Sequence, residues 1–132
     1  MSRVPDVEVM TIGYGGKKPE AFFAELEALK PDVVVDVREN PFSAFLSVYT
    51  KKGLEARLGG RYVWIRELGN VSRMLPPTLV DEEEGLEKLR ILMQRHSRVV
   101  LLCAEKDETK CHRSYIKAKI LTGHAKHFNQ ID

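Results

Sequence analysis

Long hydrophobic runs are absent from this sequence, and cysteine and net charge are scarce. No apolar stretch approaches the roughly 18 residues needed to span a bilayer, so we expect no part of the chain to enter a membrane. Residues 1–6 are largely polar and contain Pro5, so they lack the charged and then apolar layout of a secretory signal. We therefore expect a cytoplasmic protein.

The chain has only two cysteines, Cys103 and Cys111. A cytoplasmic protein of this size neither needs nor usually keeps a structural disulfide, so we expect both to be free thiols. The formal net charge is only +2, and basic residues alternate with acidic ones. The overall field is therefore weak, and any anion binding must be local.

The overall amino-acid composition is that of a globular protein. Apolar residues make up 43% of the 132 residues and charged residues 30%. This length corresponds to one domain with an ordinary hydrophobic core, and we expect residues 1–132 to form it.

Strand and helix patterns alternate along the chain. Short β-rich or apolar runs predict strands at residues 7–12, 33–37, 62–65 and 99–102. Helical spacing predicts a helix from Pro19 to just before Pro31, a short helix through Leu54 and Leu58 that ends at Gly59, a helix after Asp81 that reaches about His96, and a last helix from about His112 to Thr122 with Gly123 as its carboxyl cap.

This alternation predicts an α/β fold, because each helical crossover returns the chain to the same starting edge of a parallel sheet. We expect a single three-layer domain with a mostly parallel, Rossmann-like sheet flanked by helices. The carboxyl ends of the strands then share one edge, where open parallel sheets bind ligands.

Polar residues follow the predicted strands and open the last helix. They are Gly13, Tyr14, Asp36, Arg38, Cys103 and Glu105 at strand ends, and Cys111, His112 and Arg113 at the helix start. Free backbone N–H groups and the positive end of the helix dipole make that start a seat for phosphate or carboxylate. The candidate ligand-binding residues are therefore Gly13, Tyr14, Arg38 and Arg113.

Arg38 could grip an oxyanion with two hydrogen bonds, which a lysine cannot do. The alternative is purely structural. An ion pair from Arg38 to Glu105, or from Asp36 to Arg113, would only tie loops together.

The candidate catalytic residues are Cys111, His112, Asp36, Glu105 and Cys103. A thiol at a helix start beside a histidine has a lowered pKa, which makes Cys111 a candidate nucleophile. Asp36 and Glu105 are candidate general bases, although carboxylates at strand ends often cap loops. Cys103 ends an apolar strand, and buried cysteines are usually inert.

Cys103, Cys111, His112 and Glu105 could supply ligands to a zinc ion. Their spacing matches no established pattern, and sequence neighbours such as Cys111 and His112 rarely ligate one ion. These points favour an empty polar site over a metal site, and the sequence does not decide whether Cys103, Cys111 and His112 bind a metal. We expect no cofactor.

A nucleic-acid module is an alternative, because basic and aromatic side chains interleave in one part of the chain. They are Arg57, Arg61, Tyr62, Trp64, Arg66 and Arg73. Alternation along a strand would place Tyr62 and Trp64 on one face, so these rings also fit a core. Binding that falls steeply with salt and depends on Arg57 or Arg66 would favour this class.

The chain also resembles two families. Residues 35–39 (Val-Asp-Val-Arg-Glu) and Cys103 followed at a distance by Arg113-Ser114 are similar to a rhodanese strand and active-site loop, which implies sulfur transfer as a minor alternative. The stronger resemblance, over nearly the whole length, is to the domain of unknown function 488. It rests on Thr11-Ile12-Gly13-Tyr14, Asp36-Val37-Arg38 with Pro41 and Ser43, Tyr62, Leu68-Gly69, Cys103-Ala104-Glu105 and Cys111-His112-Arg113.

This resemblance implies an α/β domain with a polar cluster that looks catalytic or ligand-binding, and it implies no established reaction. Trp64 and Asn70 stand where the family tends to have a histidine and a second glycine. That departure leaves His112 as the main candidate for proton transfer.

The leading hypothesis is an enzyme-like site for a small anionic or phosphate-bearing ligand. The alternative is a non-catalytic module that binds nucleic acid or a protein, with rhodanese-like sulfur transfer as the minor alternative. The sequence indicates no oligomeric state.

Overall fold

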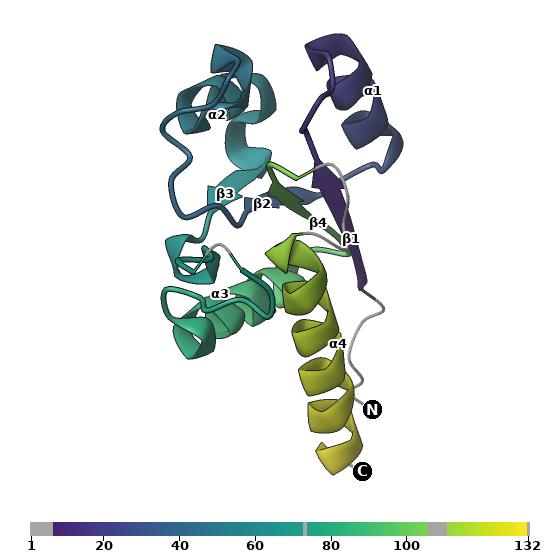
Figure 1. Ribbon diagram of the computed structural model, residues 1–132. Helices are drawn as coiled ribbons and strands as arrows, with labels where there is room; N and C mark the ends of the chain where they lie inside the picture. Colours follow the sequence, from purple (N-terminus) through teal and green to yellow (C-terminus); the bar gives the residue numbers. More distant parts are fainter. Residues whose placement is uncertain (1–6, 73, 106–110, 132) are drawn as a thin grey trace.

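The computed structural model describes residues 7–72, 74–105 and 111–131. Its centre is a four-stranded, all-parallel sheet with helices on both faces (Figure 1). The strands are β1 (Glu8–Gly13), β2 (Val33–Asp36), β3 (Tyr62–Trp64) and β4 (Arg98–Cys103), in the order β1-β4-β2-β3. The predicted α/β fold with a parallel sheet is confirmed.

Three of the four α-helices begin where the sequence predicts, and the short helix through Leu54 and Leu58, whose start was not predicted, begins at Lys51. The helices are α1 (Pro19–Ala28), α2 (Lys51–Leu58), α3 (Glu82–Arg95) and α4 (His112–Ile131), with short 3-10 helices η1 (Ser47–Tyr49), η2 (Gly59–Arg61) and η3 (Arg66–Leu68). Thr50 and Asp81 cap α2 and α3, because their side chains accept the N–H groups of Gly53 and Glu84. Local chemistry therefore sets these helix starts.

The predicted end of the last helix is wrong. Gly123 does not cap α4, which continues to Ile131. A glycine inside a helix costs only about 1 kcal/mol relative to alanine, and no proline follows to stop the helix. A single glycine is therefore a weak stop signal here.

Alternate side chains of the strands pack into two cores. Val33 and Val35 of β2 pack with α3 and α4, whereas Val34 packs with α1 and α2. β4 lies between β1 and β2, so Val99 to Cys103 are all buried. Burial on both faces explains the continuous apolar runs of these strands.

β3 follows the predicted alternation. Tyr62 and Trp64 lie on the α1 and α2 side of the sheet, and Val63 and Ile65 lie on the other side. The two aromatic residues therefore belong to a core rather than to an exposed stacking surface.

The connections of neighbouring strands leave the sheet in opposite directions. β2 leads to α2 on one face, and β4 leads to α4 on the other (Figure 1). A reversal of this kind opens a crevice at the carboxyl ends of the two strands. The loops after β2 and β4 are therefore where a ligand site is expected.

Among residues 7–72, 74–105 and 111–131, no helix combines the length and the apolar character needed to cross a membrane.

Close backbone packing at the carboxyl end of β1 gives the first prediction. A Cβ atom at Gly13 would lie 1.6 Å from the carbonyl oxygen of Glu105, whereas one at Gly60 would meet nothing within 4 Å. Gly13→Ala should lower the free energy of unfolding by about 1–3 kcal/mol, and Gly60→Ala should change it by less than about 0.5 kcal/mol. Urea denaturation measures both. Equal effects would contradict the close approach of β1 to the loop after β4.

Candidate functional site

A buried ion pair stands at the carboxyl end of β2. The Asp36 side chain is 0% exposed and that of Arg38 is 7% exposed. Arg38 Nε donates to Asp36 Oδ1 at 2.8 Å, and Nη2 donates to Oδ2 at 2.5 Å. The two residues are two positions apart in an extended chain, so their side chains point the same way. Two parallel hydrogen bonds hold the guanidinium in one orientation.

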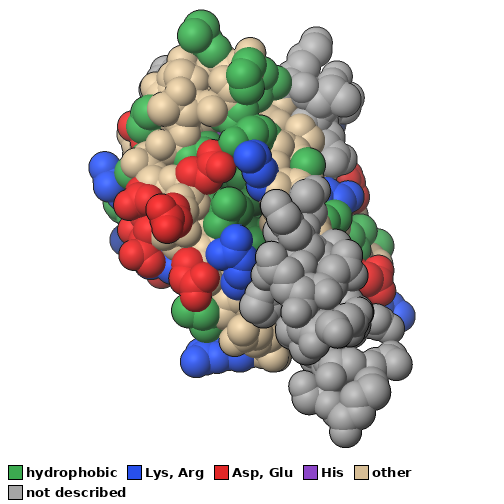
Figure 2. Space-filling view, turned by 90° about the horizontal axis from the view of Figure 1, so that it is seen from below, with side chains coloured by type: hydrophobic (Ala, Val, Ile, Leu, Met, Phe, Trp, Pro, Cys, Tyr) green, Lys and Arg blue, Asp and Glu red, His purple; other side chains and the backbone are tan. Residues whose placement is uncertain are grey.

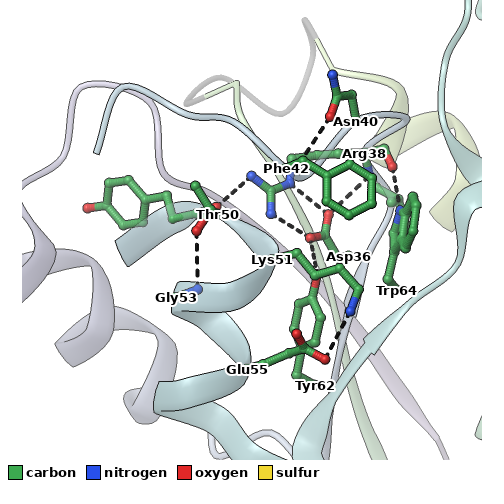
Figure 3. A network of polar contacts seen from close by, with 12 residues as sticks. Asp36, Arg38, Asn40, Phe42, Thr50, Lys51, Gly53, Glu55, Tyr62 and Trp64 are labelled. Carbon is green, nitrogen blue, oxygen red and sulfur yellow. Dashed lines mark hydrogen bonds and ion pairs between the residues drawn. The ribbon is translucent and has the colours of Figure 1, made fainter. Parts of the chain in front are cut away.

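Three aromatic residues complete this network. The Tyr62 hydroxyl donates to Asp36 Oδ2 at 2.6 Å, and Arg38 Nη1 donates to the Tyr14 hydroxyl at 3.1 Å. The Trp64 indole donates to the Arg38 carbonyl at 2.8 Å, as Figure 3 shows. Both Asp36 oxygens therefore accept hydrogen bonds from protein donors. Asp36 positions Arg38, and its predicted role as a general base has no support in this geometry.

The network also shifts two pKa values. Burial lowers the pKa of Arg38, but the hydrogen bonds and charge of Asp36 outweigh burial, so the net pKa lies above its ordinary value. Burial raises the pKa of Tyr62, and the Asp36 carboxylate raises it further. At neutral pH the arginine is charged and the tyrosine is neutral.

The two cysteines are joined by a disulfide in this structure. Cys103 ends β4 and Cys111 immediately precedes α4. The prediction that both are free thiols is therefore wrong for this state of the protein. The sequence hides the pairing, because it does not show that Cys111 lies beside the carboxyl end of β4.

His112 opens α4 and is buried beside the sulfur atoms. Its Nε2 lies 2.6 Å from the carbonyl oxygen of Val37, and its Nδ1 lies 3.6 Å from Cys111 Sγ. A carbonyl only accepts hydrogen bonds, so Nε2 carries the proton. Burial is the main cause that holds the pKa of His112 below its usual value. The neutral ring therefore directs the Nδ1 lone pair toward the sulfur side.

Arg113 lies beneath the disulfide and is also buried. Its Nη1 donates to Cys103 Sγ at 3.2 Å and to the Glu105 carbonyl at 2.6 Å. The loop after β4 is also held by Gly15, whose N–H donates to the Ala104 carbonyl at 2.7 Å. A buried positive charge therefore sits next to one of the two sulfur atoms.

A pocket of about 510 Å³ opens above these groups, within the size range of small-molecule sites. It is lined by Tyr14, Arg38, Glu39, Asn40, Ser43, Asn70, Met74, Leu75, Cys103, Ala104, Glu105, Cys111 and His112. Six of the sequence candidates thus share one pocket. Gly13, Asp36 and Arg113 are not in the lining, and they hold the lining residues in place.

Sequence reasoning missed the part of the lining that comes from two irregular segments. Asn40 and Ser43 follow β2, so the strand-end argument could have included them. Asn70, Met74 and Leu75 come from the loop between η3 and α3, and no local pattern places that loop over the sheet edge. Met74 is 68% exposed, so the pocket mouth has an apolar rim.

The described residues contain one cluster whose atoms could hold a metal ion. A single ligand atom from each of Cys103, Cys111 and His112 lies within 4.8 Å of the other two, and all three residues are buried. The sequence argument that neighbouring residues rarely ligate together does not exclude this site, because the two side chains converge in space.

Together these features define a class of protein: an α/β protein with a parallel sheet and a polar, sulfur-containing pocket at the carboxyl edge of its strands. Residues 18–78 and 77–120 match the family model described as domain of unknown function DUF488. The chain belongs to this family, as its motifs indicated. No curated protein and no solved structure matches the chain.

The buried network yields a prediction about stability. Asp36→Asn leaves the Arg38 charge buried without its carboxylate and should cost about 3–5 kcal/mol of unfolding free energy. Tyr62→Phe should cost about 1.5–3 kcal/mol, because a buried hydrogen bond to a charged group is lost. Tyr115→Phe is the matched control, since its hydroxyl donates to Glu82 at a half-exposed position. It should cost less than about 1 kcal/mol. Similar losses in all three variants would contradict a stabilising network.

Alkaline pH should weaken the fold through Tyr62. The pKa of Tyr62 is about 10 in the unfolded chain and is raised in the folded protein. At a pH between these two values, Tyr62 has lost its proton in the unfolded chain but keeps it in the folded protein. The free energy of unfolding therefore falls as the pH rises through this interval. One such group contributes a slope of about 1.4 kcal/mol per pH unit. Urea denaturation above about pH 10 should show a shallower decline for Tyr62→Phe than for the wild type. Identical declines would contradict the raised pKa.

Proposed function

We propose that this protein is an enzyme that binds a small anionic or phosphate-bearing ligand in the pocket above Cys103, Cys111 and His112. The observation that carries the proposal is the shared lining. Arg38, Cys103, Cys111 and His112 line one pocket at the point where the connections of β2 and β4 diverge. Convergent polar groups in a concave site are typical of ligand binding.

The charges beneath the pocket favour an anion. The buried charged residues in the described part of the chain are Asp36, Arg38 and Arg113, so cations outnumber carboxylates two to one. Arg38 Nη2 carries two hydrogens and donates one of them to Asp36. The second hydrogen, held by the rigid ion pair, is available to an oxyanion in the pocket.

Two carboxylates on the rim have a different role. Glu39 and Glu105 line the pocket, and Glu105 is exposed. Water screens an exposed carboxylate far more than a buried charge, so these groups weaken anion binding little. Because Asp36 is occupied by Arg38 and Tyr62, Glu105 is the better candidate for a general base.

The sulfur atoms are the candidates for covalent chemistry. They become nucleophilic thiols only after the disulfide takes up two electrons and two protons from a thiol reductant. Arg113 then stabilises an anionic Cys103, and His112 Nδ1 is the nearest base to Cys111. The active form in this proposal is therefore the reduced protein.

The nucleic-acid alternative has less support. The Tyr62 hydroxyl and the Trp64 indole are engaged within the protein, and Arg57 packs over the Phe23 ring at 4.3 Å. Acidic side chains gather on the α3 side of the face shown in Figure 2. Around the amino-terminal half of α3, Asp81, Glu83, Glu84 and Glu87 line one shallow pocket together with Arg90. Negative charge on this face would repel a phosphate backbone.

Inorganic phosphate tests the proposal. In reduced protein with a chelator present, phosphate at ten times its Kd should slow alkylation of Cys103 and Cys111 by iodoacetamide about tenfold, because the sulfur atoms lie in the same pocket. Peptide mass spectrometry measures each cysteine separately. Unchanged alkylation at saturating phosphate would reject an anion site in this pocket.

Matched arginine variants locate the binding charge. Arg38→Lys keeps the charge but loses the planar grip, so it should weaken phosphate protection, whereas Arg57→Lys lies outside the pocket lining and should leave it unchanged. Salt-dependent binding of a single-stranded oligonucleotide that is lost in Arg57→Ala would instead favour the nucleic-acid module. A persulfide on Cys103 after treatment with thiosulfate, with release of sulfite, would favour rhodanese-like sulfur transfer.

A further inference from the structure

Three ligand atoms of the kind that zinc prefers meet at the floor of the pocket. They are the Sγ atoms of Cys103 and Cys111 and a ring nitrogen of His112, all within 4.8 Å of one another. Thiolate sulfur and imidazole nitrogen are the usual ligands of Zn²⁺. Oxygen-preferring ions such as Mg²⁺ and Ca²⁺ do not suit this set.

The orientation of His112 fits a ligand. The Val37 carbonyl oxygen accepts a hydrogen bond from Nε2–H, with 2.6 Å between nitrogen and oxygen. In a neutral ring this leaves Nδ1 without a proton, so its lone pair can bind a metal. Metal-bound histidines almost always donate their other ring N–H in this way. The separation of 3.6 Å from Nδ1 to Cys111 Sγ is also suitable. With Zn–S near 2.3 Å and Zn–N near 2.0–2.1 Å, a tetrahedral ion needs about 3.6 Å between these atoms.

Arg113 forms a hydrogen bond with the third candidate ligand, Cys103. Its Nη1 donates to Cys103 Sγ at 3.2 Å, and the side chain is itself held by the Glu105 carbonyl. A donor of this kind stabilises an anionic sulfur and fixes its direction, as outer-sphere groups do in zinc sites. Hydrogen bonds from neighbouring groups therefore orient two of the three candidate ligands, Cys103 and His112.

Adjacency of two ligands in the sequence is not an obstacle here. Cys111 lies just before the first residue of α4, and His112 is that first residue. The two side chains therefore leave from different backbone conformations and converge on the same point. Cys103 comes from the end of β4, so the three ligands belong to two rigid elements and the junction between them.

We propose that, once the disulfide is reduced, Cys103, Cys111 and His112 bind one Zn²⁺ whose fourth position faces the pocket. Reduction by a thiol breaks the S–S bond, with two electrons and two protons converting it to two thiols. Zinc binding then releases both protons, because the ligands are thiolates. The disulfide and the metal are mutually exclusive, and the redox state of the cysteines controls metal binding.

This inference deepens the proposed function. A catalytic role for the zinc ion rests on the proposed function, whereas zinc binding itself does not. All three protein ligands line the pocket, and a fourth position open to a ligand is the arrangement of catalytic zinc sites, including those with two cysteines and one histidine. Zinc binding itself is measured with the metal alone, without phosphate. A failure of zinc binding is therefore distinct from a failure of anion binding.

The test compares reduced and oxidised wild-type protein. After removal of the reductant under nitrogen, zinc is titrated against a competing chromophoric chelator. The reduced protein should bind one equivalent, and the oxidised protein should bind none. Co²⁺ in place of zinc should give intense thiolate-to-metal charge-transfer absorption only in the reduced protein. No zinc uptake by the reduced wild type, or equal uptake by both forms, would overturn the proposal.

Variants assign the ligands. Cys103→Ser, Cys111→Ser and His112→Gln should each lose more affinity than the roughly 10–100-fold typical of outer-sphere changes. His96→Gln is the matched control, since His96 directly follows α3 and lies outside the pocket. Circular dichroism confirms that each variant is folded. Zinc binding that survives in folded Cys103→Ser or Cys111→Ser would also overturn the proposal.

Discussion

The buried pair of Asp36 and Arg38 is the constraint on which the functional edge of this protein depends. Two opposite charges removed from water are costly unless they are paired and hydrogen-bonded, and here Tyr14 and Tyr62 add hydrogen bonds to those within the pair. Arg38 also donates to the Tyr49 carbonyl at 2.6 Å. The pair thus links the residues that follow β1 and β2 to the first residue of β3 and the last residue of η1. These contacts hold several segments together on one wall of the pocket.

The opposite wall has a different chemistry, because its centre is sulfur rather than an ion pair. Cys103, Cys111 and His112 lie where β4 ends and α4 begins, and Arg113 brings positive charge to the same place. Sulfur atoms in such a setting have three distinct states: disulfide, free thiols and metal thiolates. An anion bound by Arg38 would lie beside Cys103 and Cys111, whether these cysteines form a disulfide, free thiols or metal thiolates. The proposed function and the zinc proposal therefore concern one pocket.

Much of this arrangement is predictable from local sequence patterns. Continuous apolar runs at Val33–Val37 and Val99–Leu102 indicate strands buried on both faces, and polar residues directly after them indicate the functional edge. Other features depend on long-range contacts. The ion pairs considered from the sequence run from Arg38 to Glu105 and from Asp36 to Arg113, whereas the structure pairs Asp36 with Arg38, a choice among partners that sequence reasoning did not make. The end of α4 was also mispredicted, since one glycine seldom outweighs continued helical hydrogen bonding.

The sequence by itself determined the alternation of strands and helices, three of the four helix starts and the group of residues at the sheet edge, because hydrophobic period and capping chemistry act over a few neighbouring positions. Only the tertiary structure decided which of those residues touch. It made Asp36 a support for Arg38, joined Cys103 to Cys111, and brought Asn70 and Met74 over the pocket. These contacts depend on the order β1-β4-β2-β3 and on the loop paths between elements. Such information is spread over the whole chain, and no single segment carries it.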